Sequence, residues 1–516
     1  MRSANGEDAI DASGKAASPD RIILVVCPTH RDYRELPRLS SPGISYIFHD
    51  YASTSLEDLV SNPDRAKDLA ADPLDEIEAI LAKARGLKLA GVITSDDYPG
   101  SALAAAVAQR LGLPGPDPAV VLLCQHKYLA RVAQAKHVPQ AVPSFALIDV
   151  AGDVLVPDGL RFPLFVKPVK SFFSIGAERV NSAAELAALL PHWNNLDQFF
   201  QPLERMLEHY TGATIGTKRL IAEGLLKGEQ VTVEGYVHGG VATIFGVVDS
   251  IMFPGTLAFS RFDYPSHLPP GVQRRMGEIA ATTMQGLGFD NGIFNIEIMY
   301  DAEPDRISII EINPRMASQF ADLYEKVDGT NSFSVLLDIA QGRTPRFTRR
   351  QGRFEFAASC VLRSFHDSVL VAVPSEADIT RLAGIYPDIR VELHATPGRK
   401  LSDEFQDGKS YRYGVLNLGG RDLADVLEQF ESCRAQLGIE LLSIETSQDA
   451  RADLPRESMA PAHNASSGER PPSAASDEIA ALPASCPSNS SRSSRKRTTR
   501  EYRRRGTTGC RIADPS

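Results

Sequence analysis

Two strand-like segments beyond the middle of the chain carry acidic residues that could hold a metal ion. The segment 294–300 reads FNIEIMY and the segment 307–313 reads ISIIEIN, so each has the alternation of a half-buried β-strand. The linker between them is short enough for an antiparallel hairpin. The acidic residues are Glu297 in the first segment and Glu311 in the second.

The register expected for this hairpin pairs Asp301 with Ile307 and places Glu297 directly opposite Glu311. Two carboxylates that face one another in an apolar sheet repel, so a cation is expected between them. Magnesium takes carboxylate and amide oxygens and keeps positions for phosphate oxygens, and Asn313 would add a third oxygen from the same face. The alternative is a solvated strand face, but apolar residues flank Glu311 on both sides.

Composition excludes several classes of protein. A chain of 516 residues with 43% hydrophobic and 23% charged residues is an ordinary globular protein of roughly three or four domains. It has neither a membrane-spanning apolar run nor the apolar core of a secretory signal, and its six cysteines contain no CxxC pair. We therefore expect neither a membrane association, a zinc site nor a disulfide framework, and a reduced cytoplasm is the expected compartment.

The net charge of −10 is unevenly distributed. Residues 446–516 carry twelve Lys/Arg against eight Asp/Glu, a net of +4, which leaves −14 on residues 1–445. The acidic charge of residues 1–445 argues against nucleic acid as a partner, although the tail segment 492–505 holds eight basic residues. We expect residues 1–20 and the basic tail 446–516 to be disordered.

Alternation of strands and helices predicts a doubly wound parallel α/β domain over residues 21–115. Its expected strands are 21–26, 44–51 and 88–94, and its expected helices are 72–85 and 101–112. A single helix is expected at 117–136, another at 271–287, and a hairpin around 238–240. The segment 253–270, rich in Phe and Pro, is expected to be a loop, either packed by those side chains or contacting substrate.

The string Ile309-Ile310-Glu311-Ile312-Asn313-Pro314-Arg315, preceded by Phe294-Asn295-Ile296-Glu297, resembles the ATP-grasp superfamily and in particular its carboxylate–amine or carboxylate–thiol ligases. The resemblance implies that Glu297, Glu311 and Asn313 bind magnesium or manganese. It also implies that Arg315 contacts the transferred phosphoryl group or the substrate carboxylate, a task that suits the planar guanidinium fork.

The resemblance extends upstream to residues that would bind ATP. Lys127 and Lys167 occupy the places of the family's two nucleotide lysines, the second on a strand whose loop would fold over the phosphates. That loop, 170–176, is not glycine-rich, and only two of its residues fit the family pattern. The ATP-binding residues implied in addition to the lysines are Ser174 and Gly176 in the loop, Glu223, Gly224, Leu225 and Leu226 in an adenine-holding segment, and Glu229 or Gln230 at the ribose.

The implied fold is α/β: the N-terminal domain, an ATP-grasp fold of two α+β subdomains that clamp ATP at 116–350, with a lid at about 145–225, and an α+β extension at 351–445. The implied activity is that of an ADP-forming ligase, which activates a small-molecule carboxylate as an acyl phosphate and joins it to an amine or thiol. The resemblance is compatible with a homodimer. A carboxylase of the biotin carboxylase type and a non-catalytic nucleotide-binding module are the alternatives. Gln319, Tyr324, Glu325 and Asp328 are candidates for shaping the acceptor site.

Overall fold

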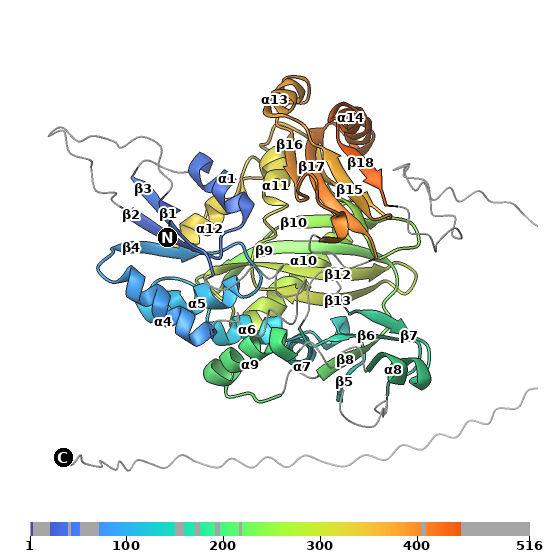
Figure 1. Ribbon diagram of the computed structural model, residues 1–516. Helices are drawn as coiled ribbons and strands as arrows, with labels where there is room; N and C mark the ends of the chain where they lie inside the picture. The colour runs from blue at the N-terminus through green and yellow to red at the C-terminus, as the bar shows by residue number, and fades with distance from the viewer. Residues whose placement is uncertain are drawn as a thin grey trace, which may run out of the picture. The chain divides into compact units, whose positions relative to one another are not determined.

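The structure of the protein is a computed structural model (Figure 1). It describes residues 2–3, 21–39, 43–51, 72–149, 159–170, 176–190, 197–215, 219–403 and 409–444. The chain divides into two compact units, 1–459 and 460–516, and all described residues belong to the first. The predictions of disorder for residues 1–20 and 446–516 therefore lie almost entirely outside the described residues.

The N-terminal part is built on a four-stranded sheet of order β1-β3-β2-β4, in which β2 runs parallel to both β3 and β4. Leu24 and Val26 of β2 face one hydrophobic core, whereas Ile23 and Val25 face another, which explains the continuous apolar run. The predicted parallel strands are confirmed. The strands are β1 (Arg2–Ser3), β2 (Arg21–Val26), β3 (Ile44–His49) and β4 (Leu89–Ile93).

Helices cover both faces of this sheet, and one of them comes from far along the chain (Figure 1). That helix packs very closely against β4 at Gly91: a Cβ atom at this position would meet the Ala340 carbonyl oxygen at 2.8 Å. The helices are α1 (His30–Leu39), α4 (Pro73–Ala84), α5 (Gly100–Leu111) and α12 (Ser332–Ala340).

The helix expected at 117–136 is in fact two helices, α6 (Pro118–Gln125) and α7 (Lys127–His137). His126 interrupts them with extended backbone angles, and its Nδ1 accepts a hydrogen bond from the Leu129 backbone N–H at 3.3 Å. A side-chain acceptor at this position satisfies one of the free N–H groups of a new helix. The interruption places Lys127 in the first turn of α7.

A second four-stranded sheet, of order β5-β8-β6-β7, is antiparallel where β8 pairs with β5 and β6 and where β6 pairs with β7. It packs against α8 over a small separate core. The elements are β5 (Phe145–Asp149), β6 (Leu164–Pro168), β7 (Glu178–Val180), α8 (Ala183–Leu189) and β8 (Arg219–Gly224). The next helix, α9 (Asp197–Thr211), instead contacts α4 and α6.

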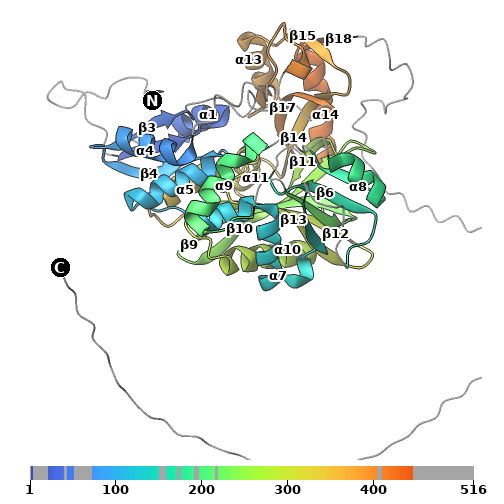
Figure 2. The ribbon, with the colours of Figure 1, turned by 60° about the horizontal axis from the view of Figure 1, so that its bottom comes forward.

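The largest sheet has eight strands in the order β13-β12-β9-β10-β11-β14-β17-β16, all antiparallel to their neighbours. Helix α10 packs on β9 and β10 and contacts α7 (Figure 2). The elements are β9 (Glu229–His238), β10 (Val241–Met252), β11 (Phe259–Tyr264), α10 (Pro270–Gly286), β12 (Gly292–Asp301), β13 (Arg306–Asn313), β14 (Phe356–Ser364), β16 (Arg390–Leu393) and β17 (Tyr411–Gly420).

The prediction of a loop at 253–270 is wrong for the central part of this segment, because Phe259–Tyr264 forms β11 between β10 and β14. Phe262 and Tyr264 alternate toward the core that contains Tyr324, which is the pattern of a strand. The surrounding Gly and Pro residues hid this alternation in the sequence.

The last strands continue the same large sheet, so the segment 351–444 shares its backbone hydrogen bonding with the strands before it. Its helix α14 packs on β14 and β17, and β15 and β18 form a separate two-stranded sheet (Figure 1). The remaining elements are α11 (Ala321–Asp328), β15 (Ser368–Ala372), α13 (Glu376–Ile385), α14 (Leu423–Gln436) and β18 (Glu440–Ser443). Among the described helices, none is both long and apolar enough to cross a membrane.

Candidate active site

The predicted pair of facing glutamates is present: Glu297 of β12 lies directly opposite Glu311 of β13. The register expected at the turn was wrong, because Asp301 pairs with Arg306 and not with Ile307. A bulge next to Glu297 compensates for this shift of one residue and restores the facing pair. Asn295 and Asn313 form the next facing pair on the same side of the hairpin.

The electrostatics of the glutamate pair favour a bound cation. Burial, and then the charge of Glu311, raise the pKa of Glu297 to about 7. Burial alone would raise the pKa of Glu311 as well, but Lys127 and Lys167 outweigh it and hold that pKa below its ordinary value. The Lys127 ammonium lies 2.9 Å from Glu311 Oε1. Two partly buried carboxylates and a nearby amide oxygen form the donor set that magnesium prefers, so the residues present fit this ion.

The predicted ATP lysines are both buried and both paired with carboxylates. Lys127 is bonded to Glu311, as described above, whereas Lys167 Nζ lies 2.9 Å from Glu223 Oε2. The other oxygen of Glu223 accepts a hydrogen bond from Arg131 Nε at 2.5 Å. Burial would raise the pKa of Glu223, but Arg131 and then Lys167 lower it to about 2. Glu223, expected at the adenine, is thus held by two cations.

The other residues expected to bind nucleotide stand at the end of β8 and just before β7. Gly224 ends β8, with Leu225 and Leu226 half-buried after it, and Gly176 has a positive φ of 72°. Gly228 is required in the following turn, because a Cβ atom would meet the Tyr300 carbonyl oxygen at 1.9 Å. Ser174 lies outside the described residues.

The two residues expected at the ribose point to different partners. Gln230 Nε2 donates to Glu297 Oε2 at 3.1 Å, which places Gln230 beside the glutamate pair. Glu229 instead lies 2.8 Å from His267 Nε2. The geometry therefore brings Gln230 to the candidate site, whereas Glu229 is engaged outside the glutamate pair.

Sequence reasoning missed that the N-terminal sheet contributes a residue, Asp97, to the candidate site. Asp97, in the loop after β4, lies 3.3 Å from Lys170 Nζ and 3.8 Å from Arg315 Nε. Burial opposes ionisation, but Lys170, Arg315 and Lys127 lower the pKa of Asp97 to about 2. The signal was available, because ligands of parallel α/β sheets bind beyond the carboxyl ends of the strands.

A match to a family model decides the nature of this region. Residues 160–322 match the model of the ATP-grasp domain, and this span contains Lys167, Glu223, Glu297, Glu311 and Arg315. The chain carries an ATP-grasp domain. The expected fold class, an α/β protein with an ATP-grasp fold, is confirmed.

Solved structures share the fold well beyond the ATP-grasp domain. An L-amino acid ligase from Bacillus licheniformis has a TM-score of 0.65 at 15% identity, over 82% of this chain and 99% of its own. The biotin carboxylase domain of a 2-oxoglutarate carboxylase from Hydrogenobacter thermophilus has a TM-score of 0.56 at 15% identity, over 82% and 91%. An N5-carboxyaminoimidazole synthase from Aspergillus clavatus has a TM-score of 0.55 at 15% identity, over 81% and 98%. Comparison with curated protein sequences finds no match.

Sequence reasoning also missed Glu234, which lies in the ATP-grasp domain. It is fully buried on β9 opposite Asn295. Burial raises the pKa of Glu234 to about 8. Its carboxyl group accepts hydrogen bonds from the Ala317 backbone N–H at 3.0 Å and from the Tyr324 hydroxyl at 3.3 Å. Glu234 therefore orders the chain immediately after Arg315.

Three of the four residues proposed to shape the acceptor site are engaged elsewhere. Tyr324 is fully buried in a core, Glu325 forms an ion pair with Arg38, and Asp328 accepts a hydrogen bond from the Tyr264 hydroxyl. Gln319 is different, since its side chain contacts polar groups on β14 and β17.

Proposed function

We propose that the protein is an ATP- and magnesium-dependent ligase, which activates a carboxylate as an acyl phosphate and joins it to an amine or thiol with release of ADP and phosphate. The observation that carries the proposal is the convergence of facing carboxylates with buried cations. Glu297 and Glu311 come from one hairpin, Lys127 from the start of α7, and Lys167 from the small sheet. The fold of an L-amino acid ligase over 82% of the chain supports the same reaction class.

Each cationic side chain of the described site lies beside a carboxylate before any ligand binds. Lys127 is paired with Glu311, Lys167 with Glu223, and Lys170 and Arg315 with Asp97. ATP would give the lysines phosphate oxygens as new partners, so that carboxylates of the hairpin become available to a metal ion. Glu297, Glu311 and Asn313 would hold magnesium, which when bound neutralises charge on the phosphates.

Each cationic side chain then has a defined task in the proposed reaction. Lys127, Lys167 and Lys170 orient the phosphates, which is the main work of a protein in phosphoryl transfer. Arg315 stabilises the negative charge that develops on the transferred phosphoryl group. The substrate carboxylate attacks the γ-phosphorus and displaces ADP; the amine then attacks the acyl carbon and displaces phosphate, so no side-chain nucleophile is required.

The proposal is tested by measuring ADP release with a panel of amino acids, in parallel with bicarbonate plus free biotin. We expect ADP formation that depends on a carboxylate and an amine together. Turnover only with bicarbonate and biotin would indicate a carboxylase, and nucleotide binding without turnover would indicate a non-catalytic module. A solved neighbour described as a domain dimer supports a proposed homodimer, which sedimentation of the same sample would test.

A further inference from the structure

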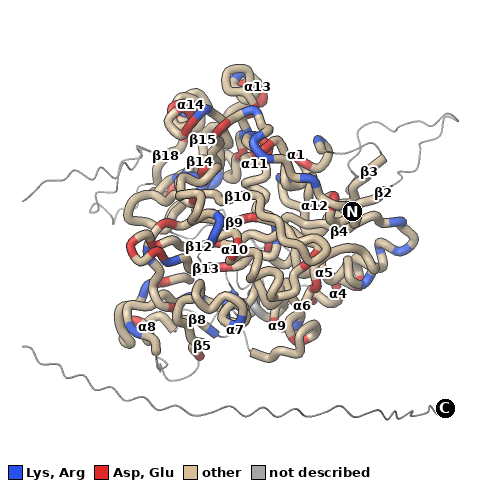
Figure 3. The backbone as a smooth tube through the Cα atoms, turned by 180° about the vertical axis from the view of Figure 1, so that it is seen from behind, with Lys and Arg blue, Asp and Glu red and all other residues tan. Residues whose placement is uncertain are grey.

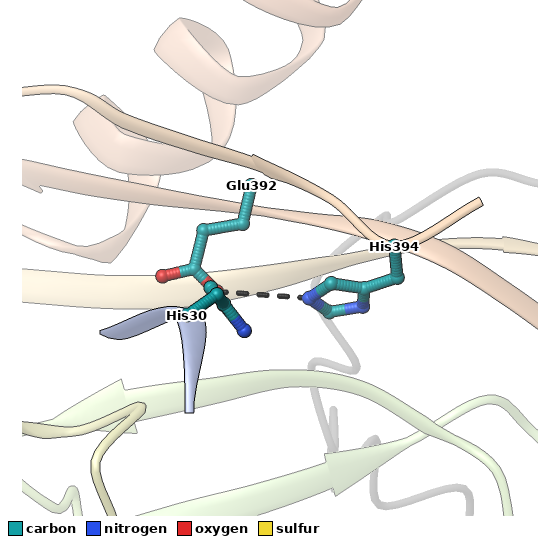
Figure 4. Close-up of side chains that lie close together, drawn as sticks. All are labelled: His30, Glu392 and His394. Atoms are coloured by element: carbon teal, nitrogen blue, oxygen red, sulfur yellow. Dashed lines mark hydrogen bonds and ion pairs between the residues drawn. The ribbon is translucent and has the colours of Figure 1, made fainter. Parts of the chain in front are cut away.

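A second cluster of charged residues lies where the N-terminal helix α1 meets β16. We call it the arginine cluster and define it as His30, Arg31, Arg34, Glu392, His394 and Arg412. Glu392 is 5% exposed, and its carboxylate lies 2.6 Å from Arg31 Nη2 and 2.7 Å from Arg34 Nη1. His30, at the start of α1, approaches the same carboxylate at 3.1 Å (Figure 4). None of these residues belongs to the ATP and metal set described above.

The described residues of the arginine cluster carry more positive than negative charge. Arg31 and Arg34 both bind the single carboxylate of Glu392, and Arg412 is close enough to feel its charge. Arg34 also pairs with a second acid, Glu35. Burial, and then the charge of Arg31, lower the pKa of Arg412 to about 9. Arg31, Arg34 and Arg412 are half-buried, and like charges that are partly removed from water are costly unless they bind an ion of opposite sign. The cluster is therefore suited to an anion.

The same observations argue against a metal ion here. One ligand atom from each of His30, Glu392 and His394 lies within 4.8 Å of the others, a spacing compatible with coordination. Yet Arg31 and Arg34 already bind the Glu392 carboxylate, and a divalent cation would have to sit beside both guanidinium groups. Basic and acidic positions are interspersed along the described chain (Figure 3). The excess of positive charge is therefore a local property of the arginine cluster.

The arginine cluster is connected to the candidate active site by the segment that follows Arg315. Arg31 Nη1 donates to Ser318 Oγ at 3.2 Å, and Arg412 Nη2 donates to Gln319 Oε1 at 3.1 Å. These partners lie three and four residues after Arg315. Four residues of extended chain span at most about 14 Å, so Gln319 can be no farther than this from Arg315. One small substrate, together with the side chains that hold it, can span such a distance.

The N-terminal sheet also presents both sites from the same edge. β2 and β4 are parallel neighbours. Ser95, in the loop after β4, bonds to Thr29 in the loop after β2 at 3.0 Å and donates to Asp32 in the first turn of α1 at 2.7 Å. The loop after β4 delivers Asp97 to Arg315, and α1, which follows β2, delivers Arg31 to Ser318. The carboxyl edge of such a sheet is where ligands bind.

Resting on the proposed ligase function, we propose that the arginine cluster binds a carboxylate of the acceptor substrate, distinct from the carboxylate that is activated. The acceptor would then be a free amino acid or a similar amino carboxylate, held at its acid end so that its amine faces the acyl phosphate. Arg31 and Arg34 now direct these donors at Glu392, so an incoming carboxylate would take over part of their hydrogen bonds. Arginine is suited to this because its planar fork binds a carboxylate through two parallel hydrogen bonds.

The test compares free L-amino acids with the matching L-amino acid amides, measured by titration calorimetry on the full chain in the presence of magnesium and ADP. The wild-type protein should bind at least one free amino acid about tenfold or more tightly than its amide. Arg31→Gln should reduce this preference to about threefold or less while leaving ADP affinity unchanged. Arg38→Gln is the matched control, since Arg38 lies on the same helix and pairs with Glu35 and Glu325.

Several outcomes would overturn the inference. Equal binding of acids and amides by the wild-type protein would do so without any variant, even if Arg31→Gln failed to fold. An equal effect of Arg38→Gln would show a general disturbance of α1, and tighter binding of O-phosphoethanolamine than of any amino acid would show a phosphate site. Zinc binding that His394→Ala abolishes would show a metal site. A preference for acids over amides without ADP formation would instead uphold the cluster and contradict the ligase proposal.

Discussion

The cations of the candidate site each have a carboxylate partner before nucleotide binds. Lys127 is bonded to Glu311 and Lys167 to Glu223, while Asp97 lies between Lys170 and Arg315. Such pairs preorganise the lysines without leaving unpaired buried charge.

Replacing Glu311 tests the proposed metal site. Glu311→Gln keeps the size of the side chain but removes one of two facing negative charges, so magnesium-dependent ATP turnover should fall below about 1% of wild type. The melting temperature should change little. Glu303→Gln, in the exposed turn of the same hairpin, is the control. Substantial residual turnover in Glu311→Gln would remove this residue from the site.

Lys167 offers a test of nucleotide binding. Lys167→Met removes a cation that we expect at the phosphates, while Arg131 still neutralises Glu223. ATP affinity measured by calorimetry should fall about tenfold or more. Lys136→Met, at an exposed position of α7, should have no effect. Unchanged ATP affinity in Lys167→Met would mean that the lysine is misassigned.

At this scale the sequence was informative where local pattern decides geometry. Strand alternation and a short turn were sufficient to predict that Glu297 faces Glu311, although the bulge that secures the pairing could not be foreseen. Asp97 was signalled only by its place after a parallel strand, and its pairing with Lys170 could not be assigned, because this pairing joins two sheets far apart in the chain. Gln230 and Glu229, left open in the sequence, have different partners in the structure.

Among the elements, β11 shows why tertiary pairing was needed. Its residues Phe259–Tyr264 lie between Gly- and Pro-containing turns, and only its hydrogen bonds to β10 and β14 identify it as a central strand. His126 is a second case, because a capping side chain divides one expected helix into two. Elements with strong apolar patterns, such as β2 and β4, were predicted to within a residue or two.

The connection after β11 predicts a pH dependence of stability. His267 Nδ1 lies 2.6 Å from Asp249 Oδ2. This hydrogen bond is the main reason why the pKa of His267 is raised to about 9. The stabilisation is complete below pH 6.5 and is lost as the pH rises through 9. Since the side chain is 58% exposed, His267→Gln should destabilise by only about 1 kcal/mol at pH 6.

Urea denaturation of the wild type and His267→Gln at pH 6 and pH 9.5 checks this expectation. The difference in unfolding free energy should shrink at the higher pH. His366→Gln, at an exposed position after β14, is the control. A difference that persists or grows at pH 9.5 would contradict a charged His267.

For the whole molecule, the eight-stranded sheet joins the ATP-grasp domain to the C-terminal strands without a break in hydrogen bonding. The sequence indicated both parts, but the order of strands depends on pairings between distant segments and could not be derived from it. The boundaries proposed at 115 and 350 remain predictions.

Composition predicts that the tail beyond Glu445 is dispensable. It is rich in Ser, Pro, Ala and Arg and contains few residues that could form a core. Truncation after Glu445 should leave ATP turnover and the melting temperature unchanged within about 1–2 °C. A large loss of either would assign the tail to the folded enzyme, and salt-sensitive binding of nucleic acid by the full chain alone would give the basic run a separate role.

The central claim is that a carboxylate is activated as an acyl phosphate, and hydroxylamine tests it most directly. The full chain is incubated with ATP, magnesium, hydroxylamine and a panel of amino acids, and the nucleotide products are separated by chromatography. We expect a hydroxamate formed in equal amounts with ADP, and loss of both in Glu311→Gln. A hydroxamate accompanied by AMP and pyrophosphate would show adenylation and contradict the account.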